Sequence, residues 1–197
     1  MKKLALVALN VSCAALLSAC GGGGDDSSAP SGPPVLGQNG AIAVGAFPVS
    51  EDSSCGNANF AVEMLKAINA ARAAARSCGS AGYAPAKALG WNELLSASSA
   101  SQAEYMASIE TITGVDAAGA DVTARVSATG YDYHAVGENL AKGYPTVSKL
   151  MTALLQSPEH CQKIMSANIS EVGAACVKAA NGVPFWVQTF GLHRSAS

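Results

Sequence analysis

The chain has 197 residues, of which 49% are hydrophobic and 13% are charged. This composition excludes a wholly disordered protein, because it supplies enough apolar surface for a packed core, and the length suits one domain plus a leader. The net charge is −2, and the sequence has neither the clustered basic charge that nucleic-acid binding needs nor a polybasic stretch for anionic lipid. We therefore expect no nucleic-acid partner.

The N-terminus has the pattern of an export signal. Two lysines precede an apolar run over residues 4–19, which is shorter than the roughly 20 apolar residues of an ordinary spanning helix. The run ends in Leu-Ser-Ala-Cys at residues 17–20. That tetrapeptide resembles the bacterial lipobox, in which cleavage precedes a cysteine that carries a diacylglyceryl group. We expect residues 1–19 to be a signal peptide and Cys20 to be the lipidated membrane anchor. By resemblance to the Gram-negative sorting rule, Gly21 favours the outer membrane. An ordinary secretory signal with a chance cysteine is the alternative.

The segment after the anchor is rich in glycine, serine and proline. It opens with four consecutive glycines, continues with acidic and serine residues, and then contains several prolines. Such a segment buries little surface and behaves as a flexible spacer. We expect residues 20–54 to be a tether and residues 55–197 to form one globular domain, with the boundary near Cys55.

Helical periodicity covers most of this domain. Apolar residues recur every three or four positions among many alanines, and glycines or a proline follow the ends of the pattern. In chain order, the predicted helical segments are 60–76, 92–109, 122–128, 147–156 and a short turn at 160–165. Residues 114–120 are predicted to form a loop.

Strands are predicted toward the C-terminus. Residues 172–178 and 185–190 fit strands, and the Asn-Gly pair between them is a hairpin turn signal. Residues 131–140 are predicted to be a strand edge or a loop. Helices followed by two terminal strands indicate an α+β layered domain. We expect Trp91 and Trp186 to lie in its core.

Four cysteines, Cys55, Cys78, Cys161 and Cys176, lie in the predicted domain. In an exported protein an even number predicts two disulfides. A zinc site is the alternative, although no closely spaced cysteine pair of the zinc-finger type is present.

A helix over residues 60–76 would be about 25 Å long, and the residues flanking it could reach back about 24 Å when fully extended. A Cys55–Cys78 bridge needs Cα atoms within about 7 Å, so we favour long-range bridges to Cys161 and Cys176. A shorter first helix would make the local pairing reachable.

Several short motifs follow one another along the domain. They are Asn69-Ala70-Ala71-Arg72, Leu89-Gly90-Trp91-Asn92, Arg125 with Gly130-Tyr131, Gly137-Glu138-Asn139-Leu140, Ser157-Pro158-Glu159-His160, and Trp186, Gln188, Phe190 and Gly191 near the end. The ordered set resembles the CAP superfamily of cysteine-rich secretory proteins, antigen 5 and pathogenesis-related 1, whose bacterial members are often called SCP-domain proteins. The resemblance covers about residues 60–192. It implies an α-β-α sandwich with a small, mainly antiparallel sheet between helical layers.

The resemblance also implies a cleft with two histidines and two glutamates, which in some members bind a divalent ion such as zinc. Glu138 and His160 match two of these four positions, whereas Ile112 and Ser157 stand at the other two. Because zinc sites use three or four protein ligands, we expect no metal and no cofactor, with zinc as the disfavoured alternative. His134 is a further ligand candidate.

Two roles remain open for Glu138 and His160. The two side chains can pair with each other as a structural contact, or they can contact a ligand or a metal. Arg125 is expected to tie a loop to a carboxylate, and Asn69 and Asn92 to bond turn backbone.

We expect a non-enzymatic binding module in the cell envelope or outside it. The sequence has no G-x-S-x-G elbow, and bridged cysteines leave no catalytic thiol. Family analogy suggests a lipid, a glycan or a protein as the ligand. The alternative is a metal-dependent hydrolase that uses Glu138 and His160, and a third hypothesis is a purely structural envelope protein.

Overall fold

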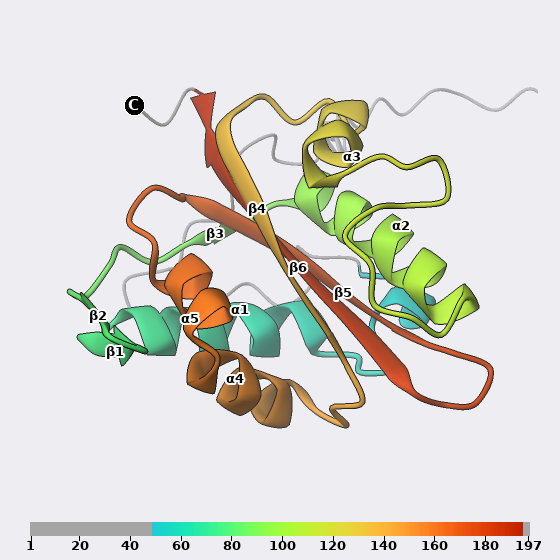
Figure 1. Cartoon of the computed structure of the whole chain (residues 1–197), viewed down its shortest axis with the longest axis horizontal. Helices are drawn as coiled ribbons and strands as arrows, with labels where there is room; N and C mark the ends of the chain where they lie inside the picture. The colour runs from blue at the N-terminus through green and yellow to red at the C-terminus, as the bar shows by residue number, and fades with distance from the viewer. Residues whose placement is uncertain (1–48, 195–197) are drawn as a thin grey trace, which may run out of the picture. The chain divides into compact units, whose positions relative to one another are not determined.

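A computed structural model of the chain describes residues 49–194, in which helices cover both faces of a four-stranded sheet (Figure 1). The helices are the 3-10 helix η1 (Glu51–Ser53) and the α-helices α1 (Phe60–Arg72), α2 (Glu93–Ser108), α3 (Val122–Ala128), α4 (Val147–Gln156) and α5 (Pro158–Met165). The strands are β1 (Arg76–Cys78), β2 (Ala81–Tyr83), β3 (Gly90–Trp91), β4 (Tyr133–Lys142), β5 (Glu171–Lys178) and β6 (Pro184–His193). The predicted α-β-α sandwich is confirmed.

The sheet has the strand order β3-β5-β6-β4. β6 runs antiparallel to both of its neighbours, β5 and β4, and β3 adds a short parallel pairing to β5, so the sheet is mainly antiparallel as expected. The Asn181-Gly182 turn joins β5 to β6, and Gly182 has the positive φ that this turn needs. β4 is an edge strand, which confirms the expectation for residues 131–140 and extends it to Lys142.

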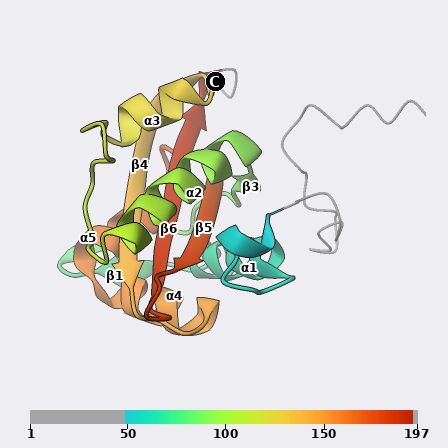
Figure 2. The same cartoon turned by 90° about the vertical axis from the view of Figure 1, so that its right-hand side faces the viewer.

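The two faces of the sheet pack against different helices. Because side chains alternate along a strand, Ala175 and Val187 meet α2, while Ala174 and Trp186 meet α1 and α4. In the view rotated by 90°, α2 lies across β6 and β5 (Figure 2). The contact between α2 and β5 is close, since a Cβ at Gly173 would collide with the backbone of α2.

The apolar core holds the predicted aromatic residues. Trp91 and Trp186 are 1% and 4% exposed, and Phe60 packs against both rings. Burial of a large apolar side chain contributes about 1.5–3 kcal/mol. Asn92 caps α2, because its side chain accepts from the backbone N–H groups of Leu94 and Leu95.

The first long helix is shorter than predicted. It ends at Arg72 rather than Arg76, and the chain continues into the β1–β2 hairpin. The Arg72 side chain is 1% exposed and donates to the carbonyls of Lys87, Ile164 and Ser166. These tertiary bonds anchor the helix end, so the helix propensity of the alanines that follow is overridden.

Two disulfides join segments that are distant in sequence. Cys55 pairs with Cys176 and Cys78 pairs with Cys161, with Cα–Cα distances of 5.2 Å and 5.4 Å. The expectation of long-range bridges is confirmed, although the first helix is short enough to weaken the geometric argument against local pairing.

The folded part begins before the predicted boundary near Cys55. Ser53 and Ser54 are buried, and Ser54 forms a parallel bridge to Cys176. The predicted signal peptide, the lipidated Cys20 and most of the predicted tether lie outside residues 49–194. Within that range no helix is long and apolar enough to cross a membrane.

Candidate functional site

Glu138 lies on β4, with its side chain toward α2 and α3. Its neighbours two positions away, Val136 and Leu140, pack with residues of these helices, whereas Asn139 points to the opposite layer. Glu138 is also paired across the sheet with Thr189, whose hydroxyl bonds that of Ser99 on α2 at 2.7 Å.

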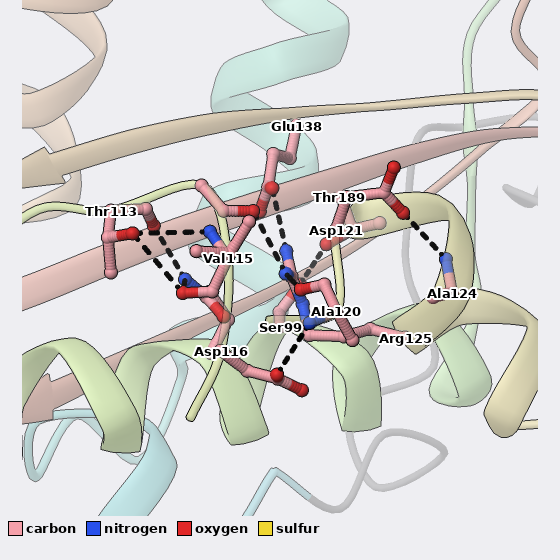
Figure 3. A network of polar contacts seen from close by, with 12 residues as sticks. Ser99, Thr113, Val115, Asp116, Ala120, Asp121, Ala124, Arg125, Glu138 and Thr189 are labelled. Carbon is pink, nitrogen blue, oxygen red and sulfur yellow. Dashed lines mark hydrogen bonds and ion pairs between the residues drawn. The ribbon is translucent and has the colours of Figure 1, made fainter. Parts of the chain in front are cut away.

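The Glu138 carboxylate forms an ion pair with Arg125 of α3 (Figure 3). Nη2 of Arg125 lies 2.6 Å from Oε1 of Glu138, and the two side chains are 4% and 10% exposed. Nη1 of the same guanidinium donates to the carbonyls of Gly114 and Ala120, at 3.1 Å and 2.8 Å. Arg125 therefore connects α3, a loop and β4, which confirms its expected role.

The segment held by Arg125 is the α2–α3 loop, residues 109–121. Gln102, fully buried on α2, donates to the carbonyls of Thr113 and Val115 at 2.6 Å and 3.3 Å. The carboxylate of Asp116 accepts from two backbone N–H groups of the loop, and Asp121 caps α3. The loop is thus fixed from both sides by side-chain hydrogen bonds.

Gln102 was not identified from the sequence. A signal was present, because Gln102 falls at helical spacing between Leu95 and Met106, which are both buried. A long polar side chain at such a position needs an internal partner.

Burial raises the pKa of Glu138, while the hydrogen bond and the charge of Arg125 act in the opposite direction. Only one carboxylate oxygen is bonded, since Oε2 is buried and has no hydrogen-bond partner within residues 49–194. The half-satisfied carboxylate explains why desolvation outweighs the ion pair.

His160 lies on α5, in the other helical layer, and is half buried. Burial is the main cause that lowers its pKa, with a further contribution from Lys163. Its contact with β4 is through the backbone, because Asn139 donates to the His160 carbonyl at 3.3 Å. The structural pairing of Glu138 with His160 was therefore wrong: the Glu138 carboxylate bonds Arg125 instead, on the opposite face of the strand.

The third candidate, His134, is exposed. It lies where the register of β4 against β6 shifts between Tyr133 and Ala135. Because of this irregularity, His134 does not follow the regular alternation of side chains along the strand. Its side chain does not form a ligand set with Glu138.

The four positions implied by the CAP resemblance do not fit a divalent metal. Ile112 has no donor atom, and Ser157 forms the junction between α4 and α5. Oε1 of Glu138 already accepts from Arg125. Residues 49–194 contain no group of three or more His, Cys, Asp or Glu side chains that could hold a metal ion. The expectation of no tight zinc site stays a prediction.

The α2–α3 loop also exposes aliphatic side chains. Ile109, Ile112 and Val115 are 41%, 42% and 43% exposed. Ile112, which stands where the family resemblance implies the first histidine, is thus an accessible residue on a hydrogen-bonded loop. An isoleucine cannot bind a metal or transfer a proton as a histidine would.

Residues 65–190 match CAP, the cysteine-rich secretory protein family. Among solved structures, an outer surface protein from Borrelia burgdorferi is 20% identical, with a TM-score of 0.51, over 55% of this chain and 80% of that chain. An extracellular SCP-domain protein from Bacillus anthracis is 14% identical, with a TM-score of 0.48, over 54% of this chain and 34% of that one. Venom allergen-like protein 4 of Schistosoma mansoni is 18% identical, with a TM-score of 0.49, over 76% and 93%.

The comparison with curated proteins gives no match. At these identities the solved structures bear on the fold alone, and the Borrelia protein has the same fold. The family match spans more than half of the chain, and it includes the β4 strand, α5 and the closing hairpin described above. The chain therefore belongs to CAP, the cysteine-rich secretory protein family.

Proposed function

We propose that this protein is a non-enzymatic binding module, displayed outside the cytoplasm on a tether that is anchored through lipid on Cys20. The observation that carries the non-enzymatic part is the Arg125–Glu138 ion pair. The guanidinium bonds Oε1 of the carboxylate, and its positive charge stands where it opposes a metal cation at Glu138. The same guanidinium fixes the α2–α3 loop, so its position serves rigidity rather than turnover.

The compartment follows from chemistry that is independent of this site. Two disulfides suit an oxidising environment outside the cytoplasm. The Leu-Ser-Ala-Cys sequence at residues 17–20 supports lipidation, and Gly21 supports sorting to the outer membrane. A binding module on a flexible tether can reach ligands within the envelope or beyond it.

The ligand classes that remain are a lipid, a glycan and a protein. The test is an open search: the native lipoprotein is extracted in detergent, and the bound material is analysed by lipidomics, glycan analysis and protein mass spectrometry. A reproducible ligand supports the proposal. The absence of any bound or captured molecule, compared with the Cys20→Ser protein as control, contradicts it.

The hydrolase alternative has a direct test. The intact protein is assayed with lipid, ester and peptide substrates in the presence and absence of zinc, beside the Glu138→Gln variant. We expect equal background rates in both. Zinc-dependent turnover that disappears in Glu138→Gln would replace the proposed function with the hydrolase.

A further inference from the structure

A second site lies away from Glu138, where α3 ends and β4 begins beside the end of β6 (Figure 1). It is an open cleft of about 400 Å³. The lining residues are Ser127, Gly130, Tyr131, Asp132, Tyr133 and Arg194. Ligand sites in proteins begin at about 300 Å³, so the cleft is large enough for a small ligand. None of its residues takes part in the Arg125–Glu138 ion pair.

The accessible aromatic ring in the cleft is that of Tyr133, which is half buried, whereas Tyr131 is only 3% exposed. The rings of Tyr131 and Tyr133 stack with centroids 6.3 Å apart and an interplanar angle of 12°. The Tyr131 hydroxyl donates to the buried carboxylate of Glu171 at 2.6 Å. The Tyr131 ring also packs on Gly191, where a Cβ would come within 2.6 Å of it. The Tyr133 ring therefore stacks on a partner that is fixed before any ligand arrives, which lowers the entropic cost of binding.

The rim carries polar groups with spare hydrogen-bonding capacity. Arg194 donates through Nε to Oδ1 of Asp132 at 2.7 Å and through Nη2 to the Tyr133 carbonyl at 2.9 Å. The two side chains are 57% and 60% exposed. Within residues 49–194 no hydrogen bond uses Oδ2 of Asp132 or Nη1 of Arg194. The hydroxyls of Ser127 and Tyr133 share a 3.1 Å hydrogen bond in which either can donate.

We infer that this cleft binds a neutral saccharide, an inference that rests on the proposed binding function and names its ligand class. A sugar presents an apolar C–H face that can pack on the ring of Tyr133, and hydroxyls that both donate and accept. Neighbouring hydroxyls match the planar carboxylate of Asp132 and the planar guanidinium of Arg194, which form charge-assisted hydrogen bonds.

Other ligand chemistries fit the cleft less well. A phosphate or carboxylate would face the carboxylate of Asp132, and a cation would face Arg194, because the rim pair has no net charge. A fatty acyl chain would bury the charged pair without offering it a hydrogen bond, which is costly. A neutral polyol satisfies donor and acceptor together.

The test is saturation-transfer difference NMR on the intact protein in a detergent without sugar groups, with the neutral sugar N,N′,N″-triacetylchitotriose, called chitotriose below, as the probe. The variants are Arg194→Ala and Tyr133→Ala. Lys149→Ala, an exposed change on α4 in the other layer, is the matched control. We expect chitotriose to bind the wild type and the control. We expect about tenfold or greater loss of affinity in Arg194→Ala, as removal of a hydrogen bond to a charged group predicts, and a clear loss in Tyr133→Ala, which removes the ring that packs on the sugar. Thermal unfolding of each variant verifies that it is folded.

Three outcomes would overturn the inference. Failure of chitotriose to bind any of the proteins contradicts the assignment of a neutral saccharide, and equal binding to the wild type and the cleft variants places the saccharide elsewhere. Displacement of chitotriose by millimolar inorganic phosphate would show an anion site at Arg194. In each case a lipid or protein captured by the native lipoprotein leaves the proposed binding function standing, so the two failures are distinguishable.

Discussion

We expect the loss of Arg125 and the loss of Glu138 to lower the free energy of unfolding by different amounts. Arg125 makes three hydrogen bonds, to Glu138 and to the carbonyls of Gly114 and Ala120. Removal of one partner of a buried pair costs about 3–5 kcal/mol, and hydrogen bonds to a charged group contribute about 1.5–3 kcal/mol each. We therefore expect Arg125→Met to lower the free energy of unfolding by about 3–5 kcal/mol.

Glu138→Gln should cost less than Arg125→Met near neutral pH, because the guanidinium keeps its two carbonyl acceptors. The amide oxygen still accepts from Arg125, and the raised pKa of Glu138 means that its buried negative charge is itself unfavourable. In the Arg125→Met background, Glu138→Gln should restore part of the lost stability, because no carboxylate is then left buried without its counter-charge.

The assay is urea unfolding followed by the fluorescence of the buried residues Trp91 and Trp186. The control is the exposed ion pair between Arg194 and Asp132, in which either substitution should leave the unfolding midpoint almost unchanged. If Glu138→Gln costs as much as Arg125→Met, the ion pair outweighs desolvation and the reasoning is refuted.

Four further outcomes are expected. Because burial raises the pKa of Glu138, the stabilisation from its protonated form is present below the unfolded pKa of about 4.3 and is lost as pH rises through the folded value. The stability of the wild type relative to Glu138→Gln should thus fall as the pH rises above the unfolded pKa in urea titrations, and a rise would contradict the pKa direction. Cys20→Ser should leave the protein soluble or unprocessed, and retention in membranes after a carbonate wash would exclude the lipid anchor. Ile112→His should not create a tight zinc site, since Arg125 holds the carboxylate; stoichiometric zinc in elemental analysis after dialysis would show that the guanidinium does not block the site. Replacing both Cys78 and Cys161 by alanine should cost about 2–5 kcal/mol of unfolding free energy, and a Cys55–Cys78 peptide in a non-reducing map would contradict the connectivity.

Local signals in the sequence predicted most of the fold. The cap at Asn92, the turn at Asn181-Gly182 and the buried tryptophans follow from side-chain chemistry that acts over a few residues. The end of α1 was misplaced because alanine propensity continues to Arg76, whereas the long-range bonds of Arg72 end the helix. No local pattern contains that information.

The site was harder to predict than the fold for a geometric reason. A motif such as Gly137-Glu138-Asn139 fixes the residue types on a strand but not which helical layer each one faces. A shift of one residue exchanges the two faces, and the layer decided between Arg125 and His160 as the partner of Glu138. Arg125 itself was assigned correctly, because a guanidinium in a loop-rich region needs carbonyl and carboxylate acceptors.

The two helical layers differ in their covalent cross-links. Both disulfides lie with α1, α4 and α5, where Cys176 and Cys161 are fully buried. On the other face, the residues that the structure describes contain no disulfide, and the α2–α3 loop depends on the side chains of Gln102 and Arg125. Hydrogen bonds open at lower free energy than covalent bonds, so local opening should begin at this loop while the disulfide-bonded layer stays folded.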